Sequence, residues 1–261
     1  MWLWQDVTQV GERPDVAYED GLRWKRRTFL CASRTVAYTL RASRRARYPS
    51  MTIRPETGLV VTVPTSGMRQ PLERFLQRHE RWILHQVERI EQIAGRVGKR
   101  WPYGETLPYR GIAHRVFVRH ASRYRSAVTH LPDEALFVDV RRPTIESARR
   151  LLARWYRAQA ERWLTERTHA LSTRLGVSWT RLTVRDQRSR WGSCSVSGTL
   201  SFNYRLVMAP PAVLDYVVMH ELAHRWELNH SSRFWALVAR HCPTYRESVA
   251  WLNTYGPFLT L

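Results

Sequence analysis

The segment VVMHELAHRWELNHSSRFW, Val217 to Trp235, constrains the fold more than any other part of the chain, because it combines three histidines and two glutamates with a run of apolar residues. Apolar residues recur at every fourth position, as on the core-facing side of a helix from Pro211 to about Trp226: Leu214, Val218 and Leu222. His220 and His224 have the same spacing. Four residues advance a helix by about 6 Å and rotate it by about 40°, so both imidazoles can reach one metal ion.

Glu221 follows His220 on the turn between the two histidines, where a carboxylate can stand beside a metal ion without binding it. This is the arrangement of HExxH metalloproteases, which have two ligands and a general base on one helix. The competing interpretation is a helix whose histidines are only packed or exposed at the surface. A third ligand would favour the metal site, since catalytic zinc uses three protein ligands and one open position.

His230 is the candidate for the third ligand, although on a continuous helix it would lie about 9 Å further along the axis and point away. The chain must therefore reverse after Trp226. Asn229 tolerates a left-handed conformation, and Ser231 or Ser232 can cap a following helix. We favour His230 because the residues that would make this turn directly flank it in the sequence.

Two other residues could complete the site: Glu247 and His241. The spacing from His220 to His230 equals that of the metzincin motif HExxHxxGxxH, but Glu227 occupies the glycine position. The metzincin turn is therefore not expected.

The charge balance is strongly basic, with 42 Lys and Arg residues against 22 Asp and Glu residues and a formal net charge of +20. Such a field attracts nucleic acids, nucleotides or acidic substrates. The alternative is a surface whose charge only keeps the protein in solution. Arg185, Arg188 and Arg190 are candidate substrate-binding residues, since guanidinium groups suit phosphate and carboxylate, but they could equally belong to a solvated loop.

Cysteine usage and the N-terminus bear on the compartment. The three cysteines are far apart and have no CxxC spacing, which disfavours a disulfide framework or a thiolate zinc cluster. The first residues lack the pattern of a signal peptide, and no apolar stretch has membrane-spanning length. We expect a cytoplasmic protein with no membrane partner and leave its oligomeric state open.

The hydrophobic pattern predicts an α+β protein with three regions. Residues 1–23 form a loose segment, and residues 24–98 form a β-rich region of antiparallel strands with one long amphipathic helix from Pro71 to Ala94. Residues 99–261 contain more strands, a helix from Ile145 to Leu175, a short antiparallel sheet, the histidine helix and C-terminal helices.

Residues 185–235 resemble the YgjP-like metallopeptidase-domain proteins, small zincins related to the WLM and SprT-like proteases. The motifs that carry the resemblance are RWGSCS, FNYRL, HELAH and NHSSRFW, and the similarity extends over most of the chain from about Thr35. The resemblance implies a zincin-like catalytic domain in residues 99–261. It also implies that His220, His224 and His230 bind Zn²⁺ and that Glu221 is catalytic.

The leading hypothesis is zinc-dependent hydrolysis of a peptide or protein substrate, with Glu221 as the general base. The segment SGTLSFNYRL, before the histidine helix, is the candidate strand for binding an extended peptide. Two alternatives remain. One is a metal-dependent hydrolase of nucleotide phosphoanhydrides. The other is a nucleic-acid-associated protein, in which the zinc is structural or proteolysis is directed at DNA-bound proteins.

Overall fold

A computed structural model describes residues 16–19, 22–31, 34–55, 57–68, 70–97, 106–121, 126–131, 135–187 and 189–261. The chain divides into two compact units, residues 1–97 and residues 98–261, which we call the N-terminal and C-terminal units. Both combine helices with small sheets, so the predicted α+β class is confirmed. No helix among the described residues is both long and apolar enough to cross a membrane.

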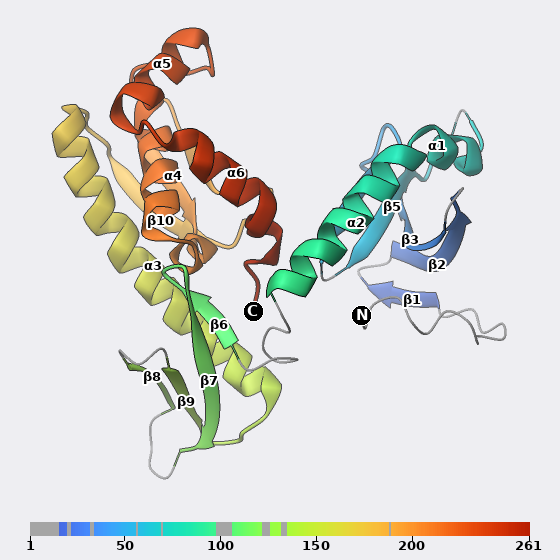
Figure 1. The fold of residues 1–261 in the computed structure, drawn as a ribbon, viewed down its shortest axis with the longest axis horizontal. Coiled ribbons are helices and arrows are strands. Elements are labelled where there is room, and N and C mark those ends of the chain that lie inside the picture. Colours follow the sequence, from blue (N-terminus) through green and yellow to red (C-terminus); the bar gives the residue numbers. More distant parts are fainter. Residues whose placement is uncertain are drawn as a thin grey trace. The chain divides into compact units, whose positions relative to one another are not determined.

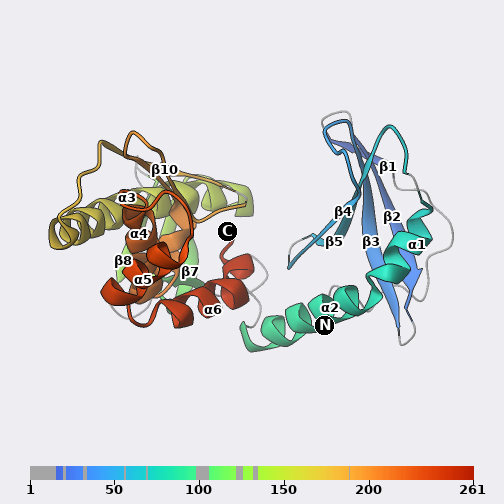
Figure 2. The same cartoon turned by 90° about the horizontal axis from the view of Figure 1, so that it is seen from above.

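The N-terminal unit is a five-stranded sheet with helices on one face (Figures 1 and 2). Its elements are β1 (Val16–Glu19), β2 (Leu22–Leu30), β3 (Thr35–Ser43), β4 (Ser50–Arg54), β5 (Gly58–Pro64), α1 (Leu72–Arg78) and α2 (Glu80–Val97). The strand order is β1-β2-β3-β5-β4. Buried residues of the sheet and helices form its core, among them Val36, Leu59, Val61, Leu76 and Ile83.

Two predictions for this unit were wrong in detail. The sheet is mixed, because β3 pairs with β5 in parallel while the other neighbours are antiparallel. The predicted single helix is divided at His79. The Nδ1 atom of His79 lies 2.8 Å from the carbonyl oxygen of Phe75, the acceptor that its own N–H would use in a continuous α-helix. The N–H of His79 turns instead to the carbonyl of Leu76, at 3.0 Å, and α1 ends there.

The C-terminal unit begins with a four-stranded sheet packed on a long helix. Its elements are β6 (Thr106–Tyr109), β7 (Ile112–His120), β8 (Ala127–Leu131), β9 (Ala135–Val140) and α3 (Ile145–Leu175). The strand order is β6-β7-β9-β8, and β7 and β9 are parallel. No strand was predicted from the sequence at β8, whose side chains are mostly exposed and give no clear alternation.

Helix α3 has the predicted bounds, and both of its ends are set by local sequence. Thr144 and Ser147 form a reciprocal capping box at the start, which satisfies backbone N–H groups that the first helical turn leaves free. At the other end Gly176 adopts a left-handed conformation with φ of 67°, which glycine reaches without steric cost. Between these caps a buried stripe including Leu152, Tyr156 and Leu164 packs into the core.

The rest of the C-terminal unit is a small sheet followed by helices. Its elements are β10 (Arg181–Arg185), β11 (Gly192–Cys194), β12 (Thr199–Asn203), the 3-10 helix η1 (Tyr204–Met208), α4 (Pro211–Ala223), α5 (Ser232–His241), α6 (Tyr245–Tyr255) and the 3-10 helix η2 (Gly256–Phe258). Figure 1 shows α4 between α3 and α6, and α4 contacts both.

This small sheet differs from the predicted antiparallel one. The strand order is β10-β12-β11, with β10 and β12 parallel and β11 and β12 antiparallel. Strand β11 was not predicted, and β12 ends earlier than its sequence suggested. It ends because the side-chain oxygen of Asn203 accepts a hydrogen bond of 3.1 Å from the N–H of Arg205, which starts η1.

Candidate metal centre

Helix α4 carries His220 and Glu221 through the middle of the C-terminal unit. It begins at Pro211, where a proline costs no hydrogen bond because the first N–H groups of a helix have no partner within it. Most of its side chains are buried, so its position is fixed by packing on several sides. Arg167 of α3 also holds α4, with hydrogen bonds of 2.6 and 2.8 Å to the carboxylate of Asp215.

The chain reverses immediately after α4, so that a third histidine meets the two on the helix. The helix ends at Ala223, earlier than predicted, and the carbonyls of Leu222 and Ala223 accept hydrogen bonds from the N–H groups of the turn. The sequence offered Asn229 for the reversal because this residue tolerates a left-handed conformation, but among the described non-glycine residues only Arg110 has a positive φ. Asn229 is therefore not left-handed, and the turn is made by these backbone hydrogen bonds.

Arg225 anchors this turn to the neighbouring loops. Its Nε donates to the carbonyl of Ser178 at 3.0 Å, and its Nη1 donates to the carbonyl of Val196 at 2.7 Å. After the turn, the hydroxyl of Ser231 accepts a hydrogen bond from the N–H of Phe234 and caps α5. The predicted serine cap is confirmed, and it fixes the backbone directly after His230.

The ring nitrogens of His220, His224 and His230 converge. Their potential ligand atoms all lie within 4.8 Å of one another, and no other such group of three occurs in the part of the chain that the structure describes. The Nε2 atoms of His220 and His230 are 3.0 Å apart. A tetrahedral ion with bonds of about 2.0 to 2.1 Å separates two ligand nitrogens by about 3.3 Å. The spacing is therefore that of ligands around one small ion.

Hydrogen bonds and burial favour the neutral rings that bind metals. Nδ1 of His224 lies 3.0 Å from the carbonyl of Glu227, so Nδ1 carries the proton and Nε2 is free to bind a metal ion. Burial lowers the pKa of His220 to about 4, with smaller contributions from His224 and His230. Burial also lowers the pKa of His224.

Aromatic rings hold His230 and His220 from the outside. Trp235 stacks on His230 with ring centroids 5.8 Å apart, and Tyr245 stacks on Trp235 with ring centroids 5.5 Å apart. The hydroxyl of Tyr216 lies 3.5 Å from Nδ1 of His220. These contacts limit rotation of the rings, so the donor set is largely preorganised.

Glu221 is buried beside this cluster, with a relative exposure of 5%. Burial raises its pKa to about 8, while the positive charge of Arg190 acts in the opposite direction. A buried carboxylate is stable in its charged form only next to a cation or strong hydrogen-bond donors. An ion held by the three histidines would supply such a charge, so the residues present fit a bound divalent metal, and the three imidazoles suit zinc.

Gly192 of β11 makes room for Glu221. A Cβ atom at Gly192 would lie 2.5 Å from Oε1 of Glu221 and 2.7 Å from its Cγ, closer than non-bonded atoms approach. The glycine of RWGSCS therefore has a steric function that sequence reasoning missed. In the sequence, only the small residues of that motif indicated that another part of the chain packs closely against it.

A cleft of about 270 Å³ opens at this point. His220, Glu221 and Tyr216 line it together with Gly192, and the other side chains are mostly apolar: Trp191, Val217, Val249 and Leu252. Tyr216 is among the residues that line the cleft, whereas Tyr204 is buried in the core and Tyr245 stacks on Trp235.

The other predicted site residues lie in different places. Arg190 acts on Glu221 through its charge, Arg185 is exposed at the end of β10, and Arg188 lies outside the described residues. Glu247 and His241 were alternative third ligands. Neither belongs to the cluster of three histidines found among the described residues.

The predicted peptide-binding strand was also misplaced. The segment SGTLSFNYRL contains β12, which is hydrogen-bonded on both sides, by β10 and by β11. Its backbone has no free edge for a substrate. The edge strands of this sheet are β10 and β11, and β11 carries Gly192 beside Glu221.

Comparison with known families agrees with this site. The sequence matches the family model of the YgjP-like metallopeptidase domain over residues 47–255, a range that extends from the N-terminal unit through α6. A search of the curated proteins finds no match. The matched range includes the three histidines, Glu221 and Gly192, and covers most of the chain. The protein therefore belongs to the YgjP-like metallopeptidase-domain family.

Proposed function

We propose that this protein is a zinc-dependent peptidase in which His220, His224 and His230 bind the metal ion and Glu221 is the general base. The observation that carries the proposal is the convergence of three imidazoles beside a buried carboxylate. The succession of long helix, small sheet, histidine helix and C-terminal helices supports a zincin-like fold for the C-terminal unit.

The chemistry divides between the metal ion and the chain. When bound, zinc would polarise the scissile carbonyl and lower the pKa of a coordinated water. Glu221 would accept the proton of the attacking water and deliver it to the leaving amine. Gly192 would keep the carboxylate in place for both transfers, and Tyr216 would orient His220 through its hydroxyl.

The edge strand β11 is the proposed platform for the substrate. An extended peptide can add to a free strand edge by backbone hydrogen bonds, and this edge lies next to Glu221. The apolar walls of the adjacent cleft favour an apolar side chain near the cleaved bond. The proposed substrates are therefore extended peptides or unfolded segments with apolar residues at the cleavage site.

The test is peptide cleavage by the zinc-loaded protein and by Glu221→Gln, with products from a mixture of peptides identified by mass spectrometry. Loss of the general base should lower kcat/KM by about 10² to 10⁴, with zinc still bound. Glu247→Gln is the matched control, because it makes the same chemical change at an exposed position on α6. Equal activity in both variants would contradict the assignment of Glu221.

Nucleotide hydrolysis is measured in the same experiment, because Arg190 is close enough to influence Glu221 and guanidinium groups bind phosphates. Nucleoside triphosphates are offered to the same preparations. Turnover of nucleotides that is lost in Glu221→Gln, with no cleavage of any peptide, would replace the peptidase proposal by a phosphoanhydride hydrolase.

A further inference from the structure

A second, larger cleft lies at the other end of the C-terminal unit, where β7 and β9 end and α3 begins. Its volume is about 1170 Å³, and none of its described lining residues also lines the cleft beside Glu221. Its lining is strongly basic and includes His120 and four arginines: Arg141, Arg142, Arg150 and Arg154. We call it the arginine cleft.

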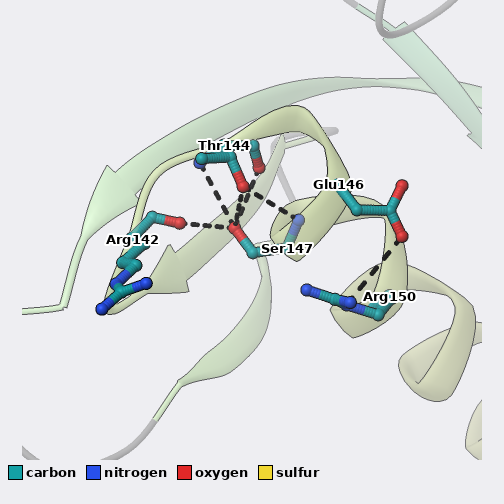
Figure 3. A network of polar contacts seen from close by, with 5 residues as sticks. All are labelled: Arg142, Thr144, Glu146, Ser147 and Arg150. Atoms are coloured by element: carbon teal, nitrogen blue, oxygen red, sulfur yellow. Dashed lines mark hydrogen bonds and ion pairs between the residues drawn. The ribbon is translucent and has the colours of Figure 1, made fainter.

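The capping box of α3 fixes the backbone on which the arginines of the cleft are mounted, and Figure 3 shows its hydrogen bonds. The hydroxyl of Ser147 donates to the carbonyl of Arg142 and lies 2.8 Å from the hydroxyl of Thr144. The N–H of Ser147 in turn donates to the hydroxyl of Thr144, at 3.2 Å. The backbone of Arg142 is thereby tied to the first turn of the helix that carries Arg150 and Arg154.

The charges of this cleft have few internal partners. Its described lining residues include no acidic residue, and within the described part of the chain Arg141, Arg142 and Arg154 form no ion pair. Arg150 has one contact of 3.9 Å with Glu146, and both side chains are mostly exposed, so this pair is weak. Four neighbouring guanidinium groups repel one another unless an anion is present.

The distribution of the arginines favours a long anion over a small one. Arg150 and Arg154 are one turn apart on α3, about 6 Å along its axis, and Arg141 and Arg142 approach from the end of β9. A single phosphate would engage only part of this set. The volume also exceeds that of most small-molecule sites, which is about 300 to 1,000 Å³.

Among the described residues that line the cleft, none is a phenylalanine, tyrosine or tryptophan on which a base could stack. Contacts with phosphate oxygens position a nucleic acid without reading its sequence. We propose that the arginine cleft binds the phosphate backbone of a nucleic acid, independently of base sequence. This inference does not rest on the proposed peptidase activity, because it concerns different residues and a different ligand.

The test is binding of the full-length protein to fluorescently labelled DNA at several salt concentrations, using a duplex of mixed sequence and a single strand of about 16 nucleotides. The double variant Arg150→Gln and Arg154→Gln should weaken binding on the order of tenfold at moderate salt. On the duplex, the slope of log K against log salt should fall by about 1.8, if each arginine neutralises one phosphate at about 0.9 per contact.

The matched control is the double variant Arg181→Gln and Arg240→Gln, which removes the same charge from exposed positions that do not line the cleft. It should keep most of the affinity and the slope. Circular dichroism and urea unfolding of both variants separate a local effect from a loss of fold, and neither measurement depends on zinc or on catalysis.

Three results would overturn the proposal. The two double variants could weaken binding equally, which would indicate only the general field of a protein with a net charge of +20. The cleft variant could bind DNA as tightly as the wild type. Poly-glutamate could compete as well as DNA at equal charge, which would identify an acidic polypeptide as the partner instead.

Discussion

Single residues at the metal centre differ in how far the sequence reveals them. His220 and Glu221 lie on α4 and His224 directly follows its last residue, so the regular geometry of a helix predicts that the three are close together. Gly192 contacts Glu221 from a strand elsewhere in the chain. No local rule links the two, and only the folded chain shows that a side chain at position 192 would occupy the space of the carboxylate.

Gly192→Ala tests this contact. The added methyl group must displace Glu221, and a shift of about 1 Å at a reacting group can lower the rate about 100-fold. We expect a loss of this order in kcat/KM for a peptide that the wild type cleaves, while zinc content stays unchanged because the methyl group is directed at the carboxylate. Unchanged activity would show that Glu221 need not occupy this position, and loss of zinc would show that Gly192 supports the histidines.

At the scale of elements, the cap of α5 determines where His230 lies. Sequence reasoning found that a serine could start a new helix, and the structure shows Ser231 in this role. It could not tell how the turn is made, because Asn229 tolerates a left-handed conformation but does not adopt it. The anchors of the turn come from Arg225 and two distant loops, which the local sequence does not show.

Ser231→Ala should destabilise the protein by about 1 kcal/mol, the usual cost of removing a serine cap. It should also weaken zinc binding, because the residue next to His230 is no longer fixed. Urea unfolding and a zinc competition titration measure the two effects. Ser232→Ala is the control, since Ser232 is the exposed first residue of the helix and does not cap it. Equal effects of the two substitutions would exclude the cap as their cause.

A second prediction at this scale concerns the four-stranded sheet. Nε2 of His130 on β8 lies 3.0 Å from Nε2 of the buried His114 on β7. Burial lowers the pKa of His130, and the charges of His114 and Arg110 lower it further. The folded protein therefore binds fewer protons here than the unfolded chain once the pH is below about 6.5.

The resulting contribution to stability is present above pH of about 6.5 and is lost as the pH falls through the lowered pKa of the folded state. Substituting His130→Gln should make the free energy of unfolding less dependent on pH below about 6.5, where the unfolded imidazole gains a proton before the folded one does. His120→Gln, an exposed position on β7, is the comparison. Urea unfolding at several pH values would refute the prediction if both variants kept the slope of the wild type.

At the scale of the whole molecule, the sequence predicts element types better than their pairing. Long periodic segments such as α3 have the predicted bounds, because propensity, caps and an apolar stripe agree. Strand partners depend on contacts between distant segments, so the parallel pairings of β3 with β5 and of β10 with β12 were missed. The same limit explains the misplaced peptide platform, since β12 shows its central position only after β10 and β11 have paired with it.

The net charge of the whole chain likewise does not show where on the protein an anionic partner binds. The net charge of +20 is visible in the sequence, but the runs of arginine most apparent there lie in the N-terminal unit. The arginine cleft draws its residues from two other places, the end of β9 and the helix α3, and the sequence does not show that these arginines lie together. Charge in the sequence predicts the class of partner, and only the fold predicts where such a partner binds.

The most direct measurement is the zinc content of the purified protein after reconstitution, by elemental mass spectrometry, for the wild type, His230→Ala and His241→Ala. We predict about one zinc ion per chain in the wild type, because a catalytic site of this kind has three protein ligands and one metal ion. His241→Ala should retain this content and His230→Ala should lose most of it. A wild type without zinc, or a His230→Ala variant that binds as much as His241→Ala, would contradict the three-histidine site.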